Sequence, residues 1–173
     1  MSKKVLIVID MQNDFIMGVL GTKEAQKIIP NVITKIETWD GDIIATADLH
    51  FKDSYNTLTE SRYIPQHCIM DTWGQKIETR VDKVFIEHTV PIYNKFSFGS
   101  MNLAKTIEEK EYDYIEIIGL CTDICIISNA LLIQNRNKEA VIAVSASCCA
   151  GTTPEMHEAA LKIMKNCCIQ IID

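Results

Sequence analysis

The stretch that decides the fold is IEIIGLCTDICIISNALLIQ, residues 115–134. An apolar run stops at Gly119, and a run with apolar residues at three- and four-residue steps begins shortly after it. The first pattern is typical of a buried strand and the second of an amphipathic helix, so the stretch predicts a strand leading directly into a helix. Cys121 and Cys125 lie at the junction. From spacing alone, Cys125 fits a reactive thiol and an ordinary buried thiol equally well.

The alternation of strands and helices continues in both directions from this stretch. The predicted strands are residues 4–10, 42–48, 83–87, 114–119, 140–146 and 168–173. The predicted helices are residues 23–39, 100–112, 122–137 and 153–167, and residues 49–75 form a long loop. Because the strands are near-continuous apolar runs, they indicate a parallel sheet buried on both faces. We therefore expect one domain over residues 1–173, a three-layer α/β/α fold with a mostly parallel, Rossmann-like sheet of six strands.

Composition argues against several classes of protein. The net charge is −6 at pH 7 and the basic residues form no run, so neither nucleic acid nor an anionic membrane is an expected partner. No apolar stretch approaches the roughly 18 residues of a membrane span. The start has no secretory cleavage pattern. Seven cysteines are an odd number, and four of them form adjacent pairs, so reduced thiols in a cytoplasmic protein are expected.

Polar residues follow several of the predicted strands directly. Asp10 follows the first strand, Asp48 and His50 the second, and Cys121 and Cys125 the fourth, while Lys95 follows the third by a short loop. In open parallel sheets, ligands bind at the carboxyl ends of the strands. We therefore expect these side chains to meet at one edge of the sheet.

Cys125 falls in the first turn of the helix predicted after residue 121, with Thr122 or Asp123 as the N-cap. Free N–H groups and the positive end of the helix dipole favour a thiolate in that turn. A nucleophilic thiol also needs a proton acceptor and a nearby cation, which Asp10 and Lys95 could supply. The alternatives are a buried thiol, or a zinc clip with Cys121, although zinc cysteines usually come with a second pair.

The loop after the second strand contains a possible metal site. Asp48 and His50 are two residues apart, and His67 and Glu60 follow in the same loop. Two imidazoles with one or two carboxylates suit zinc, manganese or iron(II) with open positions for a ligand. The alternative is a chance grouping of polar loop residues.

Taken together, these segments resemble the isochorismatase-like superfamily of cysteine hydrolases, and within it the nicotinamidase branch. The resemblance runs from one end of the chain to the other. It is carried by VLIVIDMQNDF (5–15), ATADLH (45–50), IPQHC (64–68), NKFSFGS (94–100), GLCTDICIISNA (119–130), SASCCAG (145–151) and EAALKIM (158–164).

The resemblance implies a catalytic triad of Asp10, Lys95 and Cys125. Cys125 would attack a carboxamide carbon and form a thioester. Asp10 would take the thiol proton, deliver it to ammonia and then activate water, while Lys95 would lower the pKa of Cys125. The resemblance also implies a cis peptide between Leu120 and Cys121, with the N–H groups of Cys121 and Cys125 forming the oxyanion hole.

The nicotinamidase branch also carries one divalent metal, with zinc as the first expectation and manganese or iron as alternatives. Its implied ligands are Asp48, His50, His67 and Glu60. Phe15 would flank the ring of the substrate. Many relatives have tryptophan before the proline of the histidine motif, where this chain has Ile64.

The implied activity is hydrolysis of nicotinamide to nicotinic acid and ammonia in NAD salvage, with pyrazinamide as a second substrate. The partner would be a small carboxamide, and homo-oligomers are common among relatives. One alternative is a related hydrolase acting on another amide or an N-carbamoyl compound. An alternative of another class is a non-catalytic redox or binding module that uses Cys121 and Cys125.

Overall fold

The computed structural model describes residues 2–173. The strands are β1 Lys4–Ile9, β2 Asp42–Asp48, β3 Ile92–Lys95, β4 Tyr114–Leu120, β5 Val141–Ala150 and β6 Gln170–Ile172. The α-helices are α1 Asn13–Ile16, α2 Lys23–Thr38, α3 Lys52–Tyr55, α4 Thr79–Glu87, α5 Met101–Lys110, α6 Ile127–Arg136 and α7 Pro154–Asn166. Two further turns are the 3-10 helix η1, Thr59–Arg62, and the π-helix η2, Thr122–Ile126.

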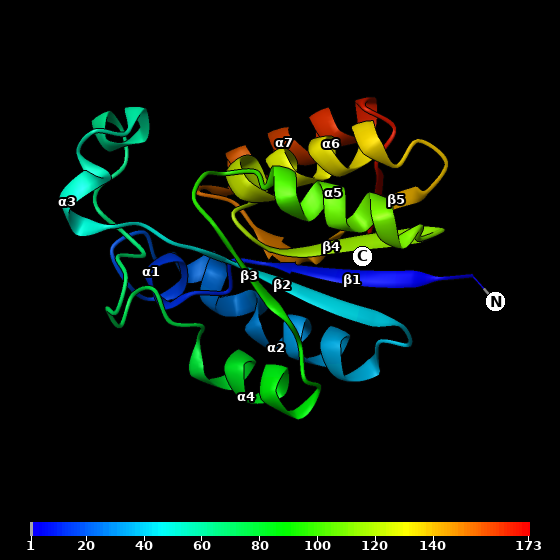
Figure 1. Ribbon diagram of the computed structural model, residues 1–173, viewed down its shortest axis with the longest axis horizontal. Helices are drawn as coiled ribbons and strands as arrows, with labels where there is room; N and C mark the ends of the chain where they lie inside the picture. Colours follow the sequence, from blue (N-terminus) through cyan, green and yellow to red (C-terminus); the bar gives the residue numbers. More distant parts are fainter. Residues whose placement is uncertain (1) are drawn as a thin grey trace.

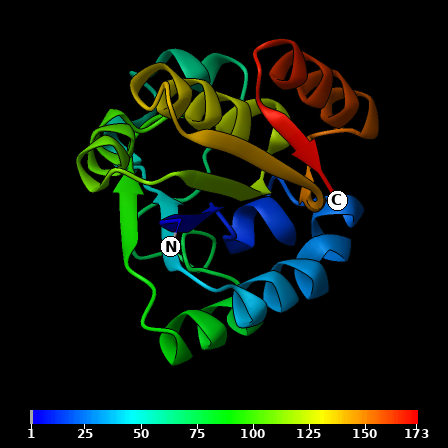
Figure 2. The same cartoon turned by 90° about the vertical axis from the view of Figure 1, so that its right-hand side faces the viewer.

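The strands form one sheet in the order β3-β2-β1-β4-β5-β6, and all neighbouring pairs are parallel. Helices α2 and α4 cover one face, and α5, α6 and α7 cover the other (Figure 1). Figure 2 shows the two helical layers with the sheet between them. The predicted three-layer α/β/α fold with a parallel six-stranded sheet is confirmed.

The centre of the sheet lies at β1 and β4. Residues 5–9 of β1 are fully buried, as are Ile115, Ile117 and Ile118 of β4. After β1 the chain moves outward to β2 on one side, whereas β4 pairs with β1 on the other side. Such a reversal of strand order leaves a crevice at the carboxyl ends of the two central strands. Asp10 and Cys121 follow those two strand ends directly.

Residues 83–87 are not a strand, contrary to the sequence prediction. They form the second half of α4, Thr79–Glu87, in which Val81, Val84 and Phe85 are buried while Ile86 is 71% exposed. The buried positions therefore follow the helical period, although the local run VFI is continuously apolar.

The third strand is β3, at the edge of the sheet, and of its four residues only Lys95 is buried. An edge strand with one buried position carries little apolar signal, which explains why the sequence IYNK was not assigned to a strand. Lys95 is thus the last residue of a strand and not part of a following loop. It stands in register with Asp48 of β2.

Side-chain caps begin two of the predicted helices. The Ser100 side chain accepts a hydrogen bond from the N–H of Leu103, and the Thr153 side chain accepts one from the N–H of Met156. Within residues 2–173, no helix has both the length and the apolar character needed to cross a bilayer.

Candidate active site

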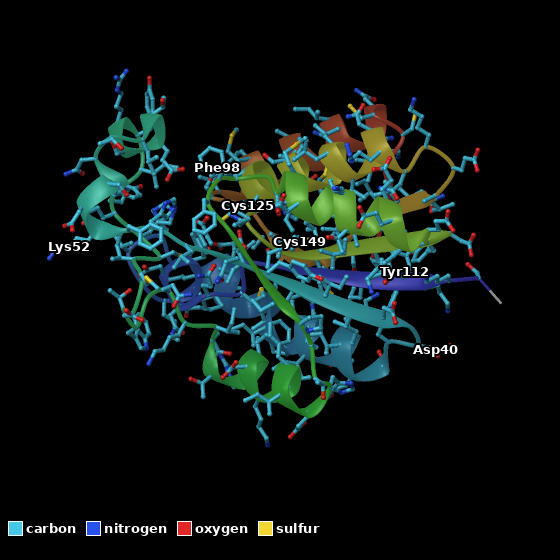
Figure 3. The ribbon with its side chains drawn as sticks, viewed as in Figure 1. Asp40, Lys52, Phe98, Tyr112, Cys125 and Cys149 are labelled. Carbon is cyan, nitrogen blue, oxygen red and sulfur yellow. The ribbon has the colours of Figure 1, made fainter. Side chains whose placement is uncertain are left out.

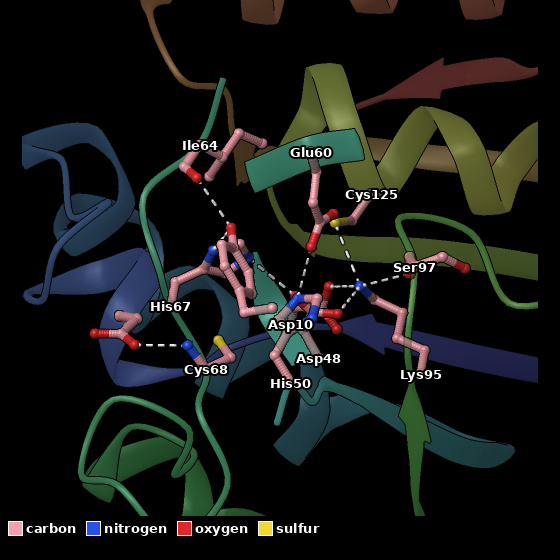
Figure 4. Close-up of polar contacts among 12 residues, drawn as sticks. Asp10, Asp48, His50, Glu60, Ile64, His67, Cys68, Lys95, Ser97 and Cys125 are labelled. Atoms are coloured by element: carbon pink, nitrogen blue, oxygen red, sulfur yellow. Dashed lines mark hydrogen bonds and ion pairs between the residues drawn. The ribbon is translucent and has the colours of Figure 1, made fainter. Parts of the chain in front are cut away.

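Three side chains from different strand ends meet at the carboxyl edge of the sheet. Lys95 Nζ lies 2.7 Å from Asp10 Oδ2 and 3.5 Å from Cys125 Sγ. All three residues are buried. Figure 4 shows the lysine ammonium between the carboxylate and the thiol. The structure therefore brings together the three residues that the sequence suggested as a triad.

Burial determines the protonation of this cluster. It raises the pKa of the Cys125 thiol well above its ordinary value, although the charge of Lys95 opposes this rise. Burial also raises the pKa of Asp10, again against the effect of Lys95. For Lys95, burial favours the neutral amine, but Asp10, Cys125 and Asp48 outweigh it and raise the pKa. Lys95 alone thus does not produce a thiolate at rest, and the thiol needs a base.

Asp10 is held on both carboxylate oxygens. Thr46 Oγ1 donates to Asp10 Oδ1 at 2.7 Å, and Oδ2 pairs with Lys95. The Asp10 N–H donates to the carbonyl of Thr46, and its φ of 49° turns the chain away from β1. Sequence analysis assigned no role to Thr46, which sits inside an apolar strand without a distinguishing pattern.

The turn that carries Cys125 is irregular. The peptide bond between Leu120 and Cys121 is cis, as the resemblance implied. Cys125 follows in the π-helix η2, where the Asn129 side chain donates to the Cys125 carbonyl at 2.8 Å. Cys121 precedes η2 and Cys125 lies within it, and both residues border the same cavity.

The predicted N-cap at Thr122 or Asp123 is wrong, because η2 begins after Cys121 without any side-chain cap. Thr122 Oγ1 instead pairs with His157 Nδ1 at 2.8 Å. The Asp123 carboxylate accepts from the N–H and hydroxyl of Thr152. Both side chains therefore tie the turn to the segment around α7.

Four side chains converge next to Lys95 on its other side. Asp48 Oδ2 lies 3.0 Å from His50 Nε2 and 3.2 Å from His67 Nε2. Glu60 Oε1 lies 3.2 Å from His50 Nε2, and Lys95 Nζ lies 3.1 Å from Asp48 Oδ1. Asp48 therefore contacts the triad through one oxygen and the histidine cluster through the other.

This cluster fits a divalent metal. The ligand atoms of Asp48, His50 and His67 all lie within 4.8 Å of one another. Ligands about 2.0–2.2 Å from a tetrahedral zinc ion stand about 3.3–3.6 Å apart, close to the separations seen here. In the part of the chain that the structure describes, the buried Oε1 of Glu60 has no hydrogen bond. A buried carboxylate oxygen without a hydrogen bond is costly, and a cation would satisfy it.

Asp48 is ionised in this setting. Burial would raise its pKa, but hydrogen bonds with His50 and His67 and the charge of Lys95 outweigh that effect and lower it. A charged carboxylate is the form that binds a metal.

Two residues of DMQNDF hold the segments of the candidate metal ligands in place, and sequence analysis assigned neither of them to the site. The Gln12 side chain accepts from the N–H of Asp48 at 2.7 Å and donates to its carbonyl at 2.8 Å. Asp14 Oδ2 accepts from the N–H of Cys68, next to His67, at 2.7 Å. The feature of the sequence that could have pointed to these two residues is a group of acid and amide side chains directly after a buried strand.

A cavity of about 400 Å³ opens beside Cys125. Its lining includes Phe15, Asp48, Ile64, His67, Phe98 and Ile124. Phe15 meets His67 edge-on, with 5.4 Å between the ring centroids. Figure 3 shows Phe98 and Cys125 together at this end of the sheet. The cavity therefore has apolar walls, with the thiol and the histidine cluster at its polar positions.

Comparison with known proteins agrees with this geometry. The family model described as "Isochorismatase domain" matches residues 4–173. An isochorismatase family protein named PncA from Bacillus subtilis (strain 168) is 30% identical, and the alignment covers 95% of each chain.

Solved structures are similar along the whole chain. The nicotinamidase/pyrazinamidase PncA of Bacillus subtilis has a TM-score of 0.85 at 28% identity, covering 99% of this chain and 100% of the other. The pyrazinamidase of Pyrococcus horikoshii in complex with zinc has a TM-score of 0.81 at 27% identity, covering 99% of each. Because the family model spans nearly the whole sequence, the chain belongs to the isochorismatase family of hydrolases.

Proposed function

We propose that this protein hydrolyses nicotinamide to nicotinic acid and ammonia through a thioester on Cys125. The observation that carries the proposal is one apolar cavity lined both by Cys125 of the thiol–ammonium–carboxylate cluster and by Asp48 and His67 of the Asp–His–His cluster. The similarity to nicotinamidase/pyrazinamidase PncA supports the same activity, and pyrazinamide is proposed as a second substrate.

In the first half-reaction, Cys125 Sγ attacks the carboxamide carbon, and the thiol proton passes to Asp10. Because the thiol pKa is raised by burial, proton transfer has to accompany the attack. Lys95 stabilises the negative charge that develops on the sulfur, and before the transfer it pairs with the Asp10 carboxylate that receives the proton. Collapse of the tetrahedral intermediate breaks the C–N bond, and Asp10 returns the proton to the leaving nitrogen, which departs as ammonia.

In the second half-reaction, Asp10 takes a proton from water, and the resulting hydroxide attacks the thioester carbon. The C–S bond breaks, the proton returns to Cys125, and nicotinic acid is released. The backbone N–H groups of Cys121 and Cys125 are proposed as the donors to the oxyanion in both halves.

Asp48, His50, His67 and Glu60 would hold one divalent metal, for which zinc is proposed. When bound, such an ion supplies a Lewis acid that orients a ring nitrogen. Phe15, beside His67, is proposed to contact the same ring. Ile64 also lines the cavity, at the position where the resemblance implies tryptophan in many relatives, so its contact with the ring would be aliphatic.

The test is ammonia release from nicotinamide by zinc-loaded protein. We expect Cys125→Ala to abolish turnover, whereas Cys167→Ala, which changes a half-buried thiol outside the cavity, retains it. We expect chelation to reduce turnover and added zinc to restore it. Zinc-loaded protein that releases no ammonia from nicotinamide would overturn the proposal, and assays with other amides and N-carbamoyl compounds would then identify the alternative hydrolase.

A further inference from the structure

Tyr55 lies directly behind the histidine cluster. It is the last residue of α3 and is 1% exposed. Its hydroxyl lies 3.0 Å from the carbonyl oxygens of Ile64 and Pro65 and 3.2 Å from His67 Nδ1. Its ring stands edge-on to both imidazoles, with centroids 5.1 Å from His50 and 5.7 Å from His67.

The positions of the hydrogens follow from these partners. A phenol keeps its single hydrogen at neutral pH. That hydrogen can go to a carbonyl, which leaves the hydroxyl oxygen free to accept.

His67 Nδ1 faces that hydroxyl and, at 2.9 Å, the carbonyl of Pro65. A carbonyl can only accept, so Nδ1 is the ring nitrogen that carries the hydrogen in the neutral imidazole. Nε2 then carries the lone pair, and Nε2 is the atom that lies 3.2 Å from Asp48 Oδ2. The same contacts hold the backbone of Ile64, which lines the cavity.

We propose that Tyr55 is a positioning residue for the metal site. It keeps the His67 ring in the orientation and tautomer that direct Nε2 at the cluster, and it holds the chain from Ile64 to His67 in place. This inference rests on the proposed function, because it assumes that the cluster binds a metal. The partner on the far side of a ligating histidine typically changes metal affinity about 10–100-fold when it is lost.

Tyr55→Phe removes the hydroxyl and keeps the ring. We expect zinc affinity, measured by competition with a chromophoric chelator and without substrate, to fall at least about 10-fold. Tyr112→Phe is the matched control, because Tyr112 is also buried and its hydroxyl bonds to Asp42. Figure 3 shows Tyr112 far along the sheet from Cys125. This control should lower stability without changing zinc affinity.

Absorption spectra of the cobalt(II)-loaded proteins give a second readout, independent of activity. We expect the visible bands to shift in Tyr55→Phe and to match the unmodified protein in Tyr112→Phe. Equal zinc affinity and identical cobalt spectra in Tyr55→Phe would overturn the role of Tyr55 while leaving the proposed function standing. If the unmodified chain binds no zinc, the metal of the proposed function fails, and the role of Tyr55 fails with it.

Discussion

At the scale of single residues, Asp10 depends on Thr46. A hydrogen bond to a charged group contributes about 1.5–3 kcal/mol, and its loss leaves a buried oxygen unpaired. We expect Thr46→Val to lower kcat about 10-fold or more, because the carboxylate is no longer held and its pKa rises further. The measurement is steady-state ammonia release.

Thr38→Val is the control for this change. Its hydroxyl donates to the carbonyl of Thr34, at the exposed end of α2. If Thr46→Val turned over as fast as Thr38→Val, the orientation of Asp10 would not depend on this hydrogen bond.

His157 is a single residue that should make the stability of the protein depend on pH. Burial lowers its pKa below 6.5, and the nearby acids Glu158 and Asp123 only partly oppose this. The unfolded chain therefore takes up a proton at a higher pH than the folded chain. The stability that neutral His157 contributes is complete above pH 6.5 and is lost as the pH falls toward the folded pKa.

We expect the unfolding free energy to fall more steeply between about pH 7 and pH 5 in the unmodified protein than in His157→Asn. Urea unfolding at several pH values measures the difference. Parallel pH profiles for the two proteins would show that His157 does not titrate differently in the folded chain.

At the scale of elements, the pairing of β1 with β4 requires a glycine where Ile9 lies opposite Gly119. Gly119 has φ +117°, and a Cβ there would lie 2.1 Å from the Ile9 carbonyl oxygen. We expect Gly119→Ala to destabilise the protein by about 3 kcal/mol or more, because neither backbone can move without breaking the ladder. Denaturant midpoints provide the measurement.

Gly99→Ala is the matched change, because the nearest atom to its added Cβ is Leu132 Cδ1, at the end of a flexible side chain. We expect this change to cost far less. Equal midpoints for the two variants would contradict the close approach at Gly119.

Elements also show where sequence patterns were ambiguous. The run at 83–87 is apolar in succession, yet only its helical positions are buried, and β3 has a single buried residue. A short apolar run is compatible with a helix and with a strand. Whether residues 83–87 form one or the other therefore depends on how they pack against the rest of the chain.

At the scale of the whole molecule, the candidate metal ligands join the end of β2 to Glu60 and His67 of the following loop. An ion that binds only the folded state stabilises it by RT ln(1 + [L]/Kd), about 2.7 kcal/mol at 100 times Kd. We therefore expect zinc to raise the melting temperature of the metal-free protein.

The rise in melting temperature caused by zinc should be lost in His50→Ala. It should be retained in His88→Ala, which changes an exposed histidine after α4. Thermal unfolding with and without zinc makes the comparison. An equal zinc response in both variants would place the stabilising ion elsewhere.

The sequence by itself determined the parallel sheet and the side chains that follow its strand ends. Apolar runs and helical spacing are local properties, and in a parallel sheet all carboxyl ends lie at one edge. Asp10, Asp48 and Cys125 could therefore be expected together before any coordinates. Lys95 was also expected there as the cation, and the resemblance added the triad as a set and the cis peptide before Cys121.

Only the tertiary structure decided how the loop between β2 and α4 contributes. Glu60 meets His50 and Tyr55 meets His67 because the loop folds back on itself: the His50 N–H donates to the Cys68 carbonyl, and the His50 carbonyl accepts from the N–H of Met70. Such contacts join residues 18 positions apart or more and leave no periodic trace in the sequence. Lys95 pairs with both Asp10 and Asp48, and this too was decided by the tertiary structure, because it depends on the register of β2 against β3.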